Sequence, residues 1–185
     1  MWILGTIILL AVGAGVLIFN RLVKARNLMD EAWSGIDVQL KRRHDLIPNL
    51  VETVKEYSGH ERGVFDNIAR LRSEIMTVDG PRTDTDAENE LSRQLKTLFA
   101  LAEAYPDLKA SGNFLDLQKS LSEIEDQVQY ARRYYNGTVR DYNILVQSFP
   151  NNLLAERLGF QREEFFEIEY ATERKAPEVD FDGRS

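Results

Sequence analysis

Residues 36–57, IDVQLKRRHDLIPNLVETVKEY, carry the pattern that decides the fold. Apolar side chains recur there, and upstream to residue 22, in steps of three and four, the spacing of one face of an α-helix. This stripe consists of Leu22, Ala25, Met29, Ala32, Ile36, Leu40, Ile47, Leu50, Val54 and Tyr57. A helix over 22–57 would be roughly 50 Å long. It must bury the stripe against partner helices of similar length.

Pro48 lies inside this stripe. Proline lacks the backbone N–H that a helix needs, and its ring crowds the preceding turn, so a kink is expected at this position. The apolar steps nevertheless continue on both sides. The pattern therefore favours one kinked helix over two separate helices.

Residues 2–19, WILGTIILLAVGAGVLIF, are uncharged, and as a helix they would span about 27 Å, close to the hydrocarbon thickness of a bilayer. We predict a transmembrane helix that continues directly into the helix over 22–57. A cleaved signal peptide is the competing interpretation, but it requires positive charges before the apolar run, and here there is only the terminal amine.

Three basic residues, Arg21, Lys24 and Arg26, follow the apolar run. The positive-inside rule then predicts that the N-terminus lies outside and the remainder of the chain in the cytoplasm. Within the run, Ala11 and Gly15 have a spacing that lets two membrane helices approach closely, although small residues are common in membrane helices generally.

Three further helices are predicted over 60–78, 85–105 and 113–149. Capping boxes begin the first two, Ser58 with Glu61 and Thr85 with Glu88, and prolines follow the last two. Because no strand-like alternation occurs and the connections are short, the sequence predicts an all-α fold. Its architecture would be an antiparallel up-down-up-down four-helix bundle with long first and fourth helices, occupying residues 22–150 beside an anchor over 1–21.

The fourth helix has an irregularity at Asn136-Gly137, a pair that elsewhere suggests a turn. The apolar stripe crosses it with two consecutive steps of four, from Ala131 to Tyr135 to Val139. This spacing predicts a local stutter or soft spot in the helix.

Residues 151–185 are predicted to hold a short amphipathic helix that Gly159 ends, followed by an acidic, partly disordered tail. Four apolar residues near the membrane-proximal end are candidates for contact with the membrane or a partner: Leu158, Phe160, Phe165 and Phe166. Docking of the aromatic pair against the base of the bundle is the alternative.

Charge and composition limit the function classes. The net charge of −7 and the pI near 5.0 argue against a nucleic-acid partner, and the absence of cysteine excludes disulfides, thiolate chemistry and a lipoprotein anchor. His44 and His60 are too far apart for a HExxH metal motif, and no phosphate-binding loop or nucleophile elbow occurs. We therefore expect no catalytic, cofactor or metal site.

Charged residues on the apolar seams form the one polar feature that stands out. We predict an interhelical polar layer made by Asp37 and Arg43 of the first long helix with Arg140 and Asp141 of the last, in which Arg43 pairs with an acid such as Asp141. The alternative is that Arg43 extends to solvent. Other residues expected beside this layer are Trp33, Arg42, Asp45, Arg132, Arg133, Tyr134 and Asn143.

Several long motifs closely resemble the bacterial LemA family. They are AWSGIDVQLKRRHDLIPNLVETVKEYSGHE (32–61), YPDLKA (105–110), ARRYYNGTVRDYN (131–143), FPNNLLAERLGF (149–160) and EEFF (163–166). The resemblance implies a single-pass protein of the bacterial inner membrane with a helical-bundle domain and no assigned enzymatic activity. The family includes a magnetosome-associated member, and its genes often lie beside a membrane metalloprotease of the HtpX type.

Three functions follow in order of preference. The first is a membrane-anchored, non-enzymatic scaffold or adaptor that also associates with copies of itself. The second is a membrane-remodelling protein that oligomerises at the membrane surface. The third is an enzyme or ligand-binding bundle, which ranks last because no convergent set of titratable groups can be named.

Overall fold

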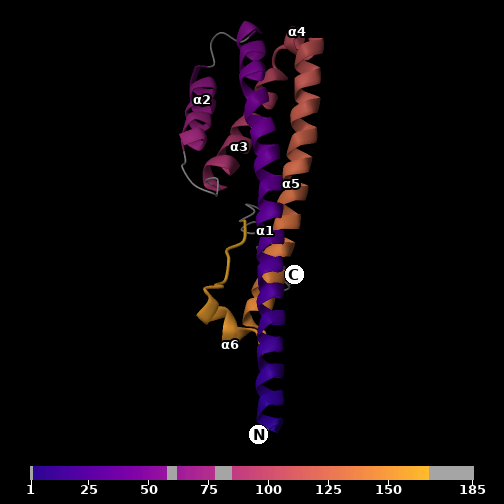
Figure 1. Cartoon of the computed structure of the whole chain (residues 1–185). Coiled ribbons are helices and arrows are strands. Elements are labelled where there is room, and N and C mark those ends of the chain that lie inside the picture. The colour runs from indigo at the N-terminus through magenta and orange to yellow at the C-terminus, as the bar shows by residue number, and fades with distance from the viewer. Residues whose placement is uncertain (1, 58–61, 78–84, 167–185) are drawn as a thin grey trace, which may run out of the picture.

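A computed structural model describes residues 2–57, 62–77 and 85–166, and this part of the chain is helical without any strand. Figure 1 shows the arrangement. The helices are α1 (Trp2–Tyr57), α2 (Arg62–Thr77), α3 (Thr85–Ala102), α4 (Pro106–Lys109), α5 (Gly112–Gln147) and α6 (Asn152–Ala155), followed by a 3-10 turn, η1 (Glu156–Leu158). The prediction of an all-α chain is confirmed.

Helix α1 is a single helix of 56 residues that runs through Pro48. Its N-terminal part projects from the body by itself, and the side chains of residues 2–15 are almost all exposed (Figure 1). Among the described residues α1 is the one helix long and apolar enough to cross a membrane. This is consistent with a single-pass membrane protein, and the helix passes from the apolar run into the body without a break.

Helices α1 and α5 lie side by side and antiparallel (Figure 1). The ring of Trp33 packs edge-on against Tyr135 at 5.2 Å, whereas Arg43, further along α1, reaches Glu125, which is earlier in α5. The shorter α2 and α3 form a hairpin beside the half of α1 that is farther from the N-terminus. The bundle is therefore uneven, because only α1 and α5 run through both halves.

The core has two parts. In the half that is farther from the N-terminus, α2, α3 and α4 bury apolar side chains against α1 and α5, centred on Ile47, Leu50, Leu91, Leu98 and Leu121. In the half nearer the N-terminus, α1 and α5 pack on each other and are covered by the segment after α5. Its buried residues are Leu22, Met29, Ala32, Ile36, Leu40, Val128, Tyr135, Val139, Tyr142, Leu145, Val146, Ala155, Phe160 and Phe166.

Helix α5 contains no stutter at Asn136-Gly137. Its buried positions 128, 132, 135, 139, 142 and 146 alternate steps of four and three, and α5 is α-helical through residue 147. The irregularity arose from assigning Ala131 to the seam. Arg132 occupies that place instead, and Ala131 is half-buried.

Two asparagines of α5 hold the extended segment 161–166. Asn136 donates from Nδ2 to the carbonyl of Phe166 at 3.0 Å and accepts the Phe166 N–H at 2.8 Å. Asn143, two turns later, makes the same pair of bonds with the backbone of Glu163, both at 2.9 Å. A side-chain amide offers the same donor and acceptor as a peptide group. These residues therefore satisfy a backbone that has no strand partner.

Gly159 ends η1 in the left-handed region at φ 77°, as expected for a helix C-terminus. The predicted capping box at Ser58 and Glu61, His60, and the acidic tail beyond residue 166 all lie outside the described residues.

Candidate functional site: a buried charge layer

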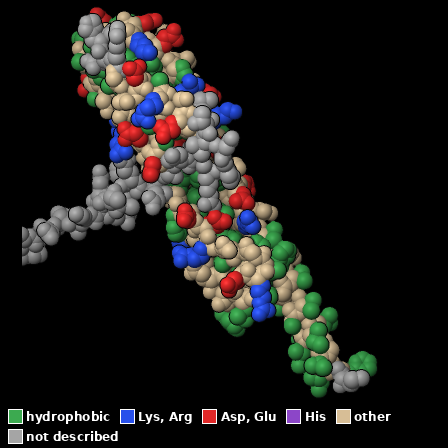
Figure 2. Space-filling view, turned by 90° about the vertical axis from the view of Figure 1, so that its left-hand side faces the viewer, with side chains coloured by type: hydrophobic (Ala, Val, Ile, Leu, Met, Phe, Trp, Pro, Cys, Tyr) green, Lys and Arg blue, Asp and Glu red, His purple; other side chains and the backbone are tan. Residues whose placement is uncertain are grey.

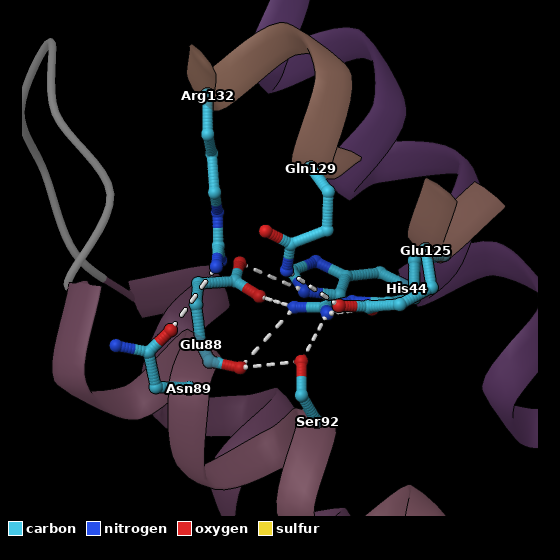
Figure 3. Close-up of polar contacts among 8 residues, drawn as sticks. His44, Glu88, Asn89, Ser92, Glu125, Gln129 and Arg132 are labelled. Atoms are coloured by element: carbon cyan, nitrogen blue, oxygen red, sulfur yellow. Dashed lines mark hydrogen bonds and ion pairs between the residues drawn. The ribbon is translucent and has the colours of Figure 1, made fainter. Parts of the chain in front are cut away.

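Arg43 lies where the two cores meet, and its side chain is completely buried. Nη1 donates to Ser92 Oγ at 2.6 Å and to Glu125 Oε2 at 3.0 Å, while Nη2 pairs with the carboxylate of Glu88 and reaches the Glu88 carbonyl at 3.4 Å. Figure 3 shows this cluster. The single side chain therefore connects α1 to both α3 and α5.

We call the group formed by Arg43, His44, Glu88, Ser92 and Glu125 the charge layer. Glu88 is its buried acid, and the side chain of Glu88 is also fully enclosed. One carboxylate oxygen faces Arg43 and the other lies 3.1 Å from Nε2 of His44. Glu88 belongs to the first turn of α3, where unpaired backbone N–H groups and the helix dipole favour a negative charge. Its carboxylate is thus used for packing α3 on α1, a role that the capping-box prediction did not include.

A second buried arginine extends the layer toward the C-terminal segment. Arg132 of α5 donates to Asn89 Oδ1 at 3.2 Å, and its guanidinium lies 4.5 Å above the centre of the Phe166 ring. Phe166 in turn packs against Trp33 at 5.7 Å. The formal charges of the two arginines cancel those of Glu88 and Glu125, so the layer is neutral overall when His44 is uncharged.

The surroundings of Glu88 set its protonation. Burial by itself raises the pKa of the carboxyl group, but the close imidazole of His44 and the positive charge of Arg43 outweigh it, so the pKa is lowered below its ordinary value of 4.5. Glu88 therefore stays ionised at neutral pH, as its pairing with Arg43 requires.

Arg43 pairs with acids of other helices, as predicted, but the choice of Asp141 as its partner was wrong. Asp141 is exposed and lies 3.3 Å from its exposed neighbour Arg140, and Asp37 is exposed on α1. None of the three reaches the layer because they point away from the α1–α5 seam. Arg43 does not extend to solvent either, since its charge is matched inside the bundle by Glu88 and Glu125.

The other predicted residues divide between buried and exposed positions. Arg132 and Asn143 are buried, Trp33 is half-buried, and Arg133 and Tyr134 are exposed. Arg42 and Asp45 line an open groove between α1 and α5 together with Glu123 and Gln127. Phe160 is buried near the base of the body and Phe166 is buried beside the charge layer, whereas Leu158 and Phe165 are about half exposed.

A sequence signal for Glu88 was present. Steps of three and four lead back from Ala102 through Leu98, Leu95 and Leu91 to position 88, so Glu88 is the one charged residue on the α3 stripe, as Arg43 is on the α1 stripe. Two opposite charges that interrupt two apolar stripes are candidates for a buried pair. The capping-box interpretation accounted for Glu88 and hid this signal.

The arrangement holds α1, α3 and α5 together at one level through side-chain contacts. The carboxylates and guanidinium groups are used on one another, and removal of one partner would leave an uncompensated buried charge. Among the residues that the structure describes, no group of three or more His, Asp or Glu side chains is placed to hold a metal ion.

Sequence comparison gives the family. The model of the LemA family matches residues 32–181, which includes every residue of the charge layer. The chain belongs to the LemA family. Protein LemA of Metamycoplasma hominis is 26% identical over 162 residues, covering 87% of this chain and 73% of that protein.

Two other relatives of this LemA-family chain are named as magnetosome proteins. Magnetosome protein MamQ 2 of Paramagnetospirillum magneticum is 25% identical over 160 residues, and magnetosome protein MamQ of Magnetospirillum gryphiswaldense is 23% identical over 159 residues. Each alignment covers 72% of this chain. The chain spans only 59% and 58% of the length of these two relatives.

We expect Glu88→Gln to destabilise the fold by about 3–5 kcal/mol, because Arg43 would keep a buried charge without its main counter-ion. The matched control is Asp141→Asn, which removes an exposed carboxylate and should change the free energy of unfolding by less than about 0.5 kcal/mol. Urea unfolding of the full chain in detergent, followed by circular dichroism, measures both. Equal effects of the two changes would contradict the assignment of the buried acid.

The lowered pKa of Glu88 predicts how stability depends on pH. A carboxyl group whose pKa is lower in the folded state contributes stability that is complete above its unfolded pKa and is lost as the pH falls through the folded pKa. The wild-type chain should therefore lose stability below pH 4.5 more steeply than the double variant Arg43→Met/Glu88→Leu, in which the pair is replaced by apolar groups. If the wild-type chain and the double variant lost the same free energy of unfolding in urea between pH 6 and pH 3, the role of Glu88 in this pH dependence would be refuted.

Proposed function

We propose that this LemA-family protein is a non-enzymatic scaffold or adaptor, anchored in the bacterial inner membrane by α1, whose helical surfaces bind other proteins, including copies of itself. The observation that carries the proposal is α1 itself, a single helix from the apolar N-terminal segment to the far end of the body. A helix without a break transmits position and direction, so a surface on the body would be held at a fixed height and orientation relative to the membrane.

The charge layer supports the same function. Buried ion pairs contribute little net stability compared with apolar packing, and their best-attested use is to fix register and partner choice. Arg43 binds α3 and α5 to one level of α1, which favours an up-down-up-down bundle in which all four helices keep one relative position. A scaffold needs such a fixed surface, whereas simple anchoring does not.

Two exposed aromatic residues offer a binding surface on the body. Tyr130 and Tyr134 lie one turn apart on α5, and their side chains are 64% and 49% exposed. Tyrosine is enriched at the centres of protein interfaces, where it supplies apolar area and a hydrogen-bonding group at small entropic cost. We propose this pair as part of the partner-binding surface, with a second copy of the chain or a membrane metalloprotease of the HtpX type as partner.

Membrane remodelling is the second candidate function. Apolar side chains are exposed near the base of the body, among them Leu153 and Leu158, and two relatives are named as magnetosome proteins. An oligomer that inserted such side chains into one leaflet would bend the membrane.

One experiment separates the two functions. In cells, we would replace Tyr130 or Tyr134 by the photo-crosslinking amino acid p-benzoylphenylalanine, with exposed Asp66 of α2 as the control position, in chains that carry two different epitope tags. The scaffold function predicts discrete protein adducts from the two tyrosine positions, adducts between the two tags, and none from position 66. Adducts would be probed for an HtpX-type protease.

The same protein would be reconstituted in liposomes and imaged by electron cryomicroscopy. A scaffold should leave the vesicles spherical, whereas remodelling would produce tubules or rings. Tubules or rings, with or without adducts between the two tags, would replace the first function by the second, and absence of both tubules and adducts would refute both.

The proposed orientation has its own test. The chain has no native cysteine, so Asn113→Cys places one thiol at the exposed start of α5, at the far end of the body. We expect a membrane-impermeant maleimide to label it only after the cells are opened, because Arg21, Lys24 and Arg26 favour a cytoplasmic body. Labelling of intact cells would reverse the orientation.

A further inference from the structure

The segment after α5 lies against the apolar part of α1. Leu154 Cδ1 is 4.0 Å from the point where a Cβ atom on Gly15 would lie, and the rings of Phe19 and Phe160 meet edge-on at 6.0 Å. In Figure 1, α6 sits beside α1 at the base of the body, where the N-terminal part of α1 begins to run alone.

This segment buries one set of apolar side chains and exposes another. Ala155 and Phe160 are buried against the body, whereas Phe149 is 80% exposed, Leu153 60% and Leu158 46%. The space-filling view shows hydrophobic side chains at the base of the body and along the helix that leaves it (Figure 2). Exposed apolar side chains grouped in this way mark a surface that is covered in use.

The height of the segment identifies what covers it. Gly15 lies four residues inside the uncharged run that ends at Phe19, and at 1.5 Å per residue it is about 6 Å nearer the N-terminus. The 18 residues of the run are about 27 Å long, slightly less than the hydrocarbon thickness of a bilayer, so all of them are needed to span it. A side chain that touches Gly15 therefore lies at the edge of the hydrocarbon, where lipid is the neighbour.

The charges around this level fit a lipid surface. Arg21, Lys24 and Arg26 of α1 and Arg157 of η1 are exposed just beyond the apolar side chains, and Glu156 is the one acid of the α6–η1 segment. Basic side chains at this height are attracted to anionic headgroups.

We infer that residues 149–158 form a second membrane contact, in which Phe149 and Leu153 insert into the interfacial layer of the bilayer beside α1. This inference rests on the proposed membrane anchorage. The sequence predicted a contact made by Leu158, Phe160, Phe165 and Phe166. In the structure Phe160 and Phe166 pack inside the protein, and Leu158 is the one of the four that belongs to the segment inferred here. Two attachment points, α1 and this segment, fix the tilt of the body above the membrane.

Fluorescence quenching tests the contact in the full chain. Leu153→Cys and, separately, Phe149→Cys would be labelled with an NBD fluorophore and reconstituted in liposomes that contain anionic lipid and doxyl-labelled lipid. Both positions are exposed, so neither substitution disturbs the core. Ile8→Cys is the control within the apolar run and Tyr130→Cys the exposed control on the body. We expect lipids labelled near the headgroup to remove most of the fluorescence at 153 and 149, lipids labelled deep in the chain to quench position 8, and neither to quench position 130.

The outcomes distinguish the contact from the anchor. If position 8 is quenched while 153 and 149 behave like 130, the second contact is refuted and the anchor stands. If position 8 is not quenched, the anchor fails and the second contact fails with it. If the NBD groups at 153 and 149 report an apolar environment that no doxyl lipid quenches, protein covers the segment and the inference is overturned.

Discussion

The structure depends on the need to match the charge of Arg43 inside a helical bundle. A guanidinium buried at this depth is tolerated only when acceptors surround it, and α1 alone supplies none in reach. Glu88 and Ser92 of α3 and Glu125 of α5 provide them. The positions of α3 and α5 along α1 follow, because a shift of either helix by one turn would separate an acid from Arg43.

The charge layer also explains why the bundle has two unlike halves. On the side of the layer that is farther from the N-terminus, α2 and α3 cover the α1–α5 pair. On the side nearer the N-terminus, the same pair is covered by the chain that follows α5. Arg132 lies where the cover changes, since it binds Asn89 of α3 on one side and the ring of Phe166 on the other. The α2–α3 hairpin and the extended segment 161–166 therefore meet at one group of charged side chains.

Periodicity predicted much of this fold, because a helix that packs along its whole length shows its buried face in sequence. The buried positions of α1 as far as Val54 and the placement of Arg43 among them were readable in this way, whereas Tyr57, which was assigned to the same stripe, is exposed. The partners of Arg43 were not, because periodicity describes each helix alone and antiparallel pairing leaves the register of α1 against α5 open. Asp141 was chosen for its proximity to other polar residues, whereas Glu88, which interrupts the apolar stripe of α3, was assigned to a helix cap. Asn136 was misjudged for a related reason: its role is to bind a backbone segment thirty residues away.

The segment from Phe149 to Phe166 connects the base of the body to the charge layer. It starts with the exposed Phe149, brings the half-buried Leu154 beside Gly15, docks Phe160 on Phe19, is held by Asn143 and Asn136, and ends with Phe166 between Trp33 and Arg132. These are separate sets of contacts between the segment and the α1–α5 pair. A displacement of the segment at the base of the body would therefore be resisted at several positions along the pair. A protein whose surface must keep one orientation to a membrane needs this continuity. Arg132 and Phe166 extend it to the layer where α3 is fixed.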